Sequence, residues 1–108
     1  MDRQSLRPIA LVDDDAGVRD SLRFLLETAG YTVETYASGT QFLAEARPEA
    51  LACLVLDQRM PQITGLELLA RLRATGQAPV TLLVTSTPGL ALARQAAELG
   101  AIGVLEKP

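Results

Sequence analysis

The sequence predicts an α/β fold in which a five-stranded parallel sheet lies between two layers of helices. Short apolar runs of strand length alternate with longer segments of helical period, in the order βαβαβαβαβ. The runs are apolar throughout, as strands covered on both faces are. Right-handed crossovers then place helices on both sides of the sheet, which gives a doubly wound, three-layer architecture.

The first predicted strand, Ile9–Val12, is a short apolar run that ends at three aspartates. A helix is expected over Gly17–Ala29, because apolar residues recur there as one helical stripe. Asp15 is expected to cap the start of this helix, and Gly30 stands where a glycine often ends one. Thr32–Tyr36 is rich in β-branched and aromatic residues, which predicts the second strand.

The middle of the chain predicts two further helices around a third strand. Ser38–Gln41 has the spacing of a capping box, so a helix is expected to begin there and to end before Pro48. The third strand is the wholly apolar run Ala52–Leu56. A second capping box at Thr64–Glu67 opens a helix that runs to about Gly76.

The last part of the chain predicts a strand, a helix and a final strand. Val80–Val84 is the fourth strand. Thr87–Pro88 has the pattern of an N-cap followed by proline at the first helical position, and the helix is expected to stop at Gly100. Ile102–Leu105 is the fifth strand.

No linker or domain boundary is visible, so residues 1–108 are expected to form one domain. The first eight residues are expected to be a loose tail. A fifth helix normally follows the fifth strand in such a fold, but the sequence stops at Pro108 before any such helix or output domain. We expect the loss of this helix to leave apolar surface that promotes self-association.

The composition excludes several classes of protein. Ten basic and 13 acidic residues give a net charge of −3, unlike the basic faces that bind nucleic acids. The absence of histidine excludes histidine-based catalysis and most zinc sites. No apolar run approaches the roughly 20 residues of a membrane span, and the N-terminus lacks a signal-peptide layout. A single cysteine, Cys53, fits a reducing compartment, so we expect a cytoplasmic protein.

Polar residues follow four of the five predicted strands. Asp13 and Asp14 follow the first strand, Asp57 the third, Thr85 the fourth and Lys107 the fifth. Active residues of open parallel sheets gather outside the carboxyl ends of the strands. We therefore expect three carboxylates, a hydroxyl and an ammonium group at one edge of the sheet.

This set of groups suits a magnesium-dependent phosphoryl transfer. Three neighbouring carboxylates repel one another unless a cation lies between them, and oxygen ligands favour a hard cation such as Mg²⁺. With Mg²⁺ bound, Asp57 stays ionised and is placed to attack phosphorus as a nucleophile. Lys107 and the metal would balance the charge of the phosphoryl group, and the Thr85 hydroxyl would donate a hydrogen bond to it.

Each of these residues also has an ordinary structural explanation. Three adjacent aspartates can form a solvated turn that caps a helix, and Asp57 can belong to a turn after a strand. Lys107 can be a surface lysine, although it is the chain's one lysine beside nine arginines. The combination at matching strand ends favours the functional interpretation.

Four segments of the chain match a known family. They are Leu11–Asp15, the pattern D-x-x-M-P-x-x-x-G at Asp57–Gly65, Thr85–Ser86 and Glu106–Pro108. Together they resemble the receiver domain of two-component response regulators over nearly the whole chain. The resemblance implies a flavodoxin-like sheet with the strand order 2-1-3-4-5.

The resemblance also implies roles for the acidic residues. Asp57 would be the phospho-acceptor, and Asp14 and Asp57 would be direct ligands of Mg²⁺. Asp13 would act on the metal mainly through water. The main-chain carbonyl of Arg59 would supply a further ligand.

The remaining family positions are partly matched. Thr85 corresponds to the switch hydroxyl and Lys107 to the lysine that pairs with the phosphoryl group, and the Lys107–Pro108 bond would be cis. Val104 stands where the family usually has tyrosine or phenylalanine, and Ser86 where glycine or alanine is commoner. Because valine has no aromatic ring to rotate, we expect coupling to the output surface to be weaker or to follow another route.

The function implied is that of a signalling domain and not of an enzyme. A histidine kinase or phosphotransfer protein would phosphorylate Asp57, and the domain would then control an output, with homodimerisation as one use of its surface. The sequences of residues 18–22 and 57–61 look most similar to those of receivers of FixJ-type transcriptional regulators. A DNA-binding domain is therefore expected beyond Pro108.

Three alternatives stay open at this point. An aspartate-nucleophile phosphohydrolase of the haloacid dehalogenase type needs a second aspartate two residues after the nucleophile, and Arg59 at that position argues strongly against this alternative. A non-phosphorylated receiver would act as an interaction module in spite of its intact acceptor residues. A stand-alone receiver would have no output domain.

Overall fold

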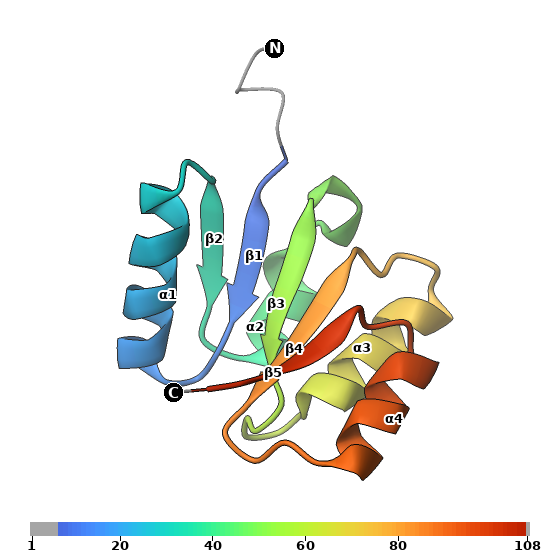
Figure 1. The fold of residues 1–108 in the computed structure, drawn as a ribbon. Coiled ribbons are helices and arrows are strands. Elements are labelled where there is room, and N and C mark those ends of the chain that lie inside the picture. Colours follow the sequence, from blue (N-terminus) through green and yellow to red (C-terminus); the bar gives the residue numbers. More distant parts are fainter. Residues whose placement is uncertain (1–6, 108) are drawn as a thin grey trace.

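The computed structural model describes residues 7–107, which form a five-stranded parallel sheet with helices on both faces (Figure 1). The strands lie in the order β2-β1-β3-β4-β5, and all neighbours are parallel. This confirms the predicted fold class and strand order, and the predicted strand limits agree to within one residue. The strands are β1 (Ile9–Val12), β2 (Val33–Tyr36), β3 (Cys53–Asp57), β4 (Thr81–Thr85) and β5 (Gly103–Glu106).

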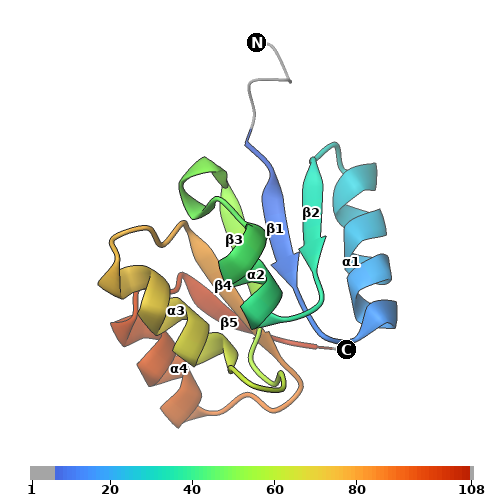
Figure 2. The same ribbon diagram turned by 180° about the vertical axis from the view of Figure 1, so that it is seen from behind.

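The helices are divided unequally between the two faces of the sheet. One face carries α1, and the other carries α2, α3 and α4, which lie in front of the sheet in Figure 2. No helix within residues 7–107 has the length and apolar character needed to cross a membrane. The helices are α1 (Ala16–Thr28), α2 (Gly39–Glu45), α3 (Gly65–Ala74) and α4 (Leu90–Glu98), with a 3₁₀ turn η2 (Pro48–Ala50) after α2.

The hydrophobic core lies mainly between the sheet and the face that carries α2, α3 and α4. Phe42 of α2, Leu68 of α3 and the β-strand residues Leu54, Leu56 and Leu83 are fully buried there. Their alternation along β3 follows from the period of two, since every second side chain points to the same face.

The opposite face is only partly covered. A groove of about 720 Å³ runs between α1 and the exposed side of β3, β4 and β5. In Figure 1 no helix crosses in front of these three strands. The apolar residues that line the groove are Val18, Leu22, Leu25 and Leu26 of α1 and Val55, Leu82, Val84 and Leu105 of the strands.

Three predicted helix caps are present, one of them in altered form. The Asp15 carboxylate accepts the Val18 N–H at 3.1 Å, as expected for an N-cap. Thr64 and Glu67 form the complete capping box at the start of α3. Ser38 caps α2, but the Gln41 side chain accepts the N–H of Ala37, so only half of that predicted box forms.

The predicted start of α4 is wrong. The helix begins at Leu90, and its N-cap is Gly89, which supplies no side-chain hydrogen bond. Thr87 instead donates its N–H to the Thr85 hydroxyl at 3.1 Å. Because this bond draws Thr87 into the turn at the end of β4, neither Thr87 nor Pro88 starts the helix.

The predicted N-terminal tail, residues 1–8, extends too far along the chain. The Pro8 carbonyl accepts the Ala52 N–H at 2.9 Å, so Pro8 already belongs to the folded domain. Residues 1–6 and Pro108 lie outside the described residues, and with them the predicted cis bond between Lys107 and Pro108.

Candidate functional site

Three aspartates meet at the carboxyl edge of the sheet. Asp13 follows β1 and Asp57 ends β3, and the pairing of Val12 with Leu56 brings these strand ends together. One carboxylate oxygen from each of Asp13, Asp14 and Asp57 lies within 4.8 Å of the other two. Asp13 and Asp57 are 2% and 4% exposed, whereas Asp14 is exposed to solvent. The predicted acidic cluster is therefore present and opens to solvent at Asp14.

Lys107 links two of the three carboxylates. Its Nζ lies 2.8 Å from Asp13 Oδ2 and 3.0 Å from Asp57 Oδ1. Its main-chain N–H donates to the Thr85 carbonyl at 2.8 Å, which fixes Lys107 beside the end of β4. One ammonium group thus pairs with two of the three carboxylates, and the cluster keeps an excess of negative charge.

The ionisation of the site reflects this imbalance. Burial raises the pKa of the Asp57 carboxyl above its usual value, and the charges of Asp13 and Asp14 act in the same direction, against the opposing effect of Lys107. Burial acts to lower the pKa of Lys107, but its hydrogen bonds to Asp13 and Asp57 outweigh this and raise it. Lys107 therefore stays charged. Ionisation of Asp57 costs more free energy than that of a free aspartate unless a second cation lies nearby.

Thr85 is buried at the end of β4, one residue beyond the register partner of Asp57. Its hydroxyl accepts the Thr87 N–H and lies 3.4 Å from the Thr87 hydroxyl. Arg59 lies two residues beyond Asp57 in the connection to α3, and its side chain is exposed. The structure thus brings Asp13, Asp14, Asp57 and Lys107 into direct proximity, with Thr85 at the neighbouring strand end.

The first turn of α3 packs tightly against the end of β3. A Cβ atom on Gly65 would lie 2.5 Å from the Asp57 carbonyl oxygen and 2.8 Å from Leu83 Cδ1. Gly65 donates its N–H to the Gln58 carbonyl at 3.0 Å, and the Gln58 side chain accepts the Leu66 N–H at 2.8 Å. Gly65 is part of the sequence pattern noted above, and this close approach gives its physical reason.

One contact at the site was not predicted from the sequence. Arg19 of α1 donates a hydrogen bond from Nη1 to the Asp13 carbonyl at 2.7 Å. Arg19 lies four residues after the N-cap Asp15, on the same side of the helix. This spacing is the signal in the sequence that points toward the strand end.

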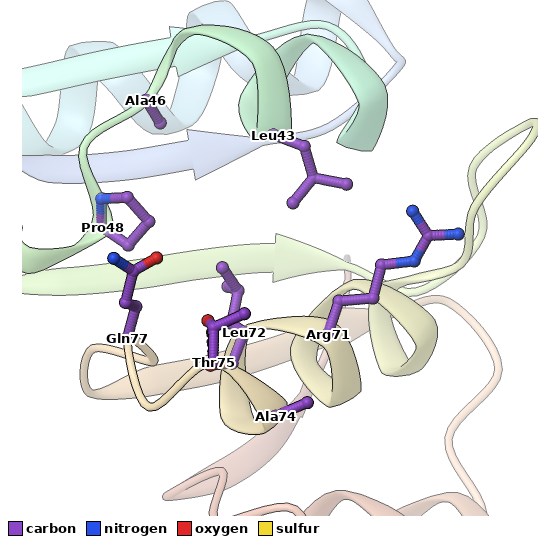
Figure 3. A pocket seen from close by; sticks show the side chains of 8 residues that line it. All are labelled: Leu43, Ala46, Pro48, Arg71, Leu72, Ala74, Thr75 and Gln77. Carbon is purple, nitrogen blue, oxygen red and sulfur yellow. Dashed lines mark hydrogen bonds between the residues drawn. The ribbon is translucent and has the colours of Figure 1, made fainter.

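A second cavity, of about 470 Å³, lies between α2, η2 and α3 (Figure 3). It is lined by Leu43, Ala46, Pro48, Arg71, Leu72, Ala74, Thr75 and Gln77. None of the residues of the acidic cluster is among them, so this cavity is separate from the candidate site.

Comparison with known proteins supports one family. The family described as response regulator receiver domain matches residues 9–108. The transcriptional regulatory protein FixJ of Azorhizobium caulinodans is 44% identical over 101 residues, which cover 94% of this chain and 48% of that protein. The C4-dicarboxylate transport transcriptional regulatory protein DctR of Rhodobacter capsulatus is 37% identical over 93% of this chain and 52% of its own length. The chain thus spans about half the length of the curated relatives it matches.

Solved structures agree with this assignment. A crystal structure named FixJ-N has a TM-score of 0.83 and 35% identity, and covers 94% of this chain and 82% of that one. The chemotaxis protein CheY4 of Vibrio cholerae has a TM-score of 0.87 and 30% identity, over 95% and 88% of the two chains. This chain belongs to the response regulator receiver domain family.

Proposed function

We propose that this domain accepts a phosphoryl group on Asp57 from a histidine kinase or phosphotransfer protein. The observation that carries the proposal is the buried Asp57 carboxylate at the end of β3, beside two other carboxylates and 3.0 Å from the Lys107 ammonium. The strand end holds the nucleophile in place, and Lys107 supplies positive charge where the phosphoryl oxygens would lie.

In the proposed step, a carboxylate oxygen of Asp57 forms a bond to phosphorus. The P–N bond of a phosphohistidine donor breaks, and the imidazole leaves with the bonding electron pair and takes up a proton. With acetyl phosphate as donor, the P–O bond breaks and acetate leaves. Thr85 would donate its hydroxyl hydrogen to a phosphoryl oxygen, and Lys107 would exchange part of its pairing with Asp57 for the phosphoryl group.

The cluster fits a magnesium ion. Its donors are carboxylate oxygens within 4.8 Å of one another, and carboxylate oxygen is the ligand type that Mg²⁺ prefers. The negative charge of the three carboxylates exceeds the positive charge of the Lys107 ammonium that pairs with two of them. Asp14 and Asp57 would hold the ion directly, Asp13 would hold it mainly through water, and the Arg59 carbonyl would add a ligand. When bound, Mg²⁺ would neutralise charge on the phosphoryl oxygens.

Phosphorylation would then shift the domain between two conformations and so control an output. Thr85 would carry the change to α4 and β5, where Val104 is half-buried in place of an aromatic side chain. Because the relatives are about twice as long, we propose that the receiver unit precedes a DNA-binding output domain in a longer cytoplasmic regulator, with homodimerisation through its surface.

Intact mass after incubation with acetyl phosphate tests the proposal. With Mg²⁺, the wild-type chain should gain the mass of one phosphoryl group, and the gain should be lost on chelation and in Asp57→Asn. Asp20→Asn, an exposed aspartate on α1, is the matched control and should be phosphorylated like wild type. A folded wild-type chain that gains no mass would contradict the proposal and favour a non-phosphorylated interaction module.

A further inference from the structure

Asp13 is held at all of its polar groups. Its N–H donates to the Tyr36 carbonyl, and its carboxylate accepts the Asp15 N–H at 2.9 Å and the Lys107 ammonium at 2.8 Å. Its carbonyl lies beyond the last paired residue of β1, and Arg19 is the donor that reaches it. The Arg19 bond is thus the one that fixes the peptide group between Asp13 and Asp14.

Asp14 depends on this peptide group. Its carboxylate is exposed and makes no hydrogen bond to the residues 7–107 that the structure describes. The side chain is therefore positioned only through the main chain on either side of it. The following residue is fixed by the helix cap of α1, and the preceding peptide group is fixed by Arg19.

We infer that Arg19 is a positioning residue for metal binding. By holding the peptide group between Asp13 and Asp14, the Arg19 guanidinium keeps the Asp14 carboxylate beside Asp57 and so strengthens Mg²⁺ binding. Hydrogen-bonding partners behind a metal ligand orient it in this way, and their loss typically weakens metal affinity by about 10- to 100-fold. The inference rests on the proposed function, because it needs Mg²⁺ to bind at this cluster.

The same helix offers a matched control. Arg23 lies one turn further along α1, where it is exposed and pairs with Glu27 at 3.1 Å. Its replacement removes an arginine and a hydrogen bond from the helix but leaves the acidic cluster untouched. A general loss of helix stability would affect variants of both arginines, whereas a positioning role belongs to Arg19 alone.

The test is a Mg²⁺ titration of the unphosphorylated 108-residue chain, followed by NMR amide shifts. In Arg19→Met the dissociation constant should rise by about 10-fold. Arg19→Lys, which keeps the charge and a donor, should fall between wild type and Arg19→Met, and Arg23→Met should match wild type. Phosphorylation of Arg19→Met by acetyl phosphate should return to the wild-type rate at saturating Mg²⁺, since only ion affinity is changed.

Two results would overturn the inference while leaving the proposed function in place. One is wild-type Mg²⁺ affinity in Arg19→Met, and the other is an equal loss of affinity in Arg23→Met. If Arg19→Met does not fold by circular dichroism, Arg19→Gln takes its place with the same expectations, because glutamine is a good helix former with a shorter side chain. A wild-type chain that binds no Mg²⁺ would overturn both the inference and the proposed function.

Discussion

The two faces of the sheet differ in how much apolar surface their helices bury. On one face, α3 buries Gly65, Leu68, Leu69 and Leu72 against the strands. On the other face, α1 is the longest helix and has no fully buried residue, and an apolar groove lies beside it. The comparison shows that the helices of one face bury far more apolar side chain than α1 does on the other, although the acidic cluster lies at the edge that both faces share.

Both faces nevertheless contribute to the site. From the packed face, the first turn of α3 reaches the end of β3 through Gly65 and Gln58. From the open face, α1 reaches the end of β1 through Arg19. The first connection depends on close steric fit and the second on a single charged hydrogen bond, so the two should respond differently to substitution.

The largest expected effect compares the same substitution on the two faces. Leu68→Ala should lower the free energy of unfolding by about 2–5 kcal/mol, because Leu68 is fully buried and its truncation leaves a cavity. Leu25→Ala, on α1, should change it by less than about 0.5 kcal/mol, because Leu25 is 61% exposed. Urea unfolding measures both, and equal effects would show that the faces do not differ as described.

The next effect concerns the steric fit at the end of β3. Gly65→Ala should cost about 1–3 kcal/mol of stability, because the new methyl group meets the Asp57 carbonyl and the Leu83 side chain. It should also slow the proposed phosphorylation, since the carbonyl that must move belongs to Asp57, the proposed acceptor. Gly89→Ala is the control, because a Cβ there meets nothing within 4 Å. Wild-type stability and rate in Gly65→Ala would contradict the close approach.

Substitution of the proposed acceptor, Asp57, should stabilise the metal-free domain. In a chelating buffer, Asp57→Asn should raise the free energy of unfolding by about 1 kcal/mol, because it removes a buried charge beside two others. Lys107 is not left unpaired, since Asp13 remains 2.8 Å away. Chemical unfolding in parallel with Asp20→Asn provides the measurement. A less stable Asp57→Asn would mean that the Lys107 pair outweighs the repulsion.

The smallest expected effect is a pH dependence at the capping box of α3. The Thr64 N–H donates to Glu67 and lowers the pKa of its carboxyl below its usual value. A group with a lowered folded-state pKa stabilises the fold above its unfolded pKa, and the effect is lost as the pH falls through the folded value. Wild type should therefore melt slightly above Glu67→Gln at pH 7, and the difference should disappear in acid. A difference that persists in acid would exclude the charge as its origin.

Much of this structure was predictable from local patterns. The five strands, their parallel direction and the acidic cluster follow from apolar runs, four of which end at a polar residue, whereas the strand order 2-1-3-4-5 was implied by the family resemblance. The start of α4 was not predictable in this way, because Thr87 has an N-cap pattern but bonds to Thr85 instead. The same holds for Gln41, which selects the Ala37 N–H over that of Ser38. In both cases two partners lie within reach of one side chain or amide, and local spacing does not choose between them.

The site was predictable at the level of residue types and less so at the level of contacts. Asp13, Asp14, Asp57 and Lys107 meet because parallel strand ends share one edge. The spacing from Asp15 indicates the side of α1 on which Arg19 lies, but its partner, the Asp13 carbonyl, depends on how α1 packs back toward β1.

The hydrogen bonds at the start of α3 have a consequence for how the site handles an anion. Helix N-termini often bind phosphate, because their free N–H groups and the helix dipole attract negative charge. In α3 the first three N–H groups already have acceptors, from the carbonyl and side chain of Gln58 and from the Thr64 hydroxyl. The start of this helix therefore borders the site but offers none of these three N–H groups to an anion. In the proposed phosphorylation, the positive charge that meets the phosphoryl group would therefore come from Lys107, which pairs with Asp13 and Asp57, and from a bound Mg²⁺.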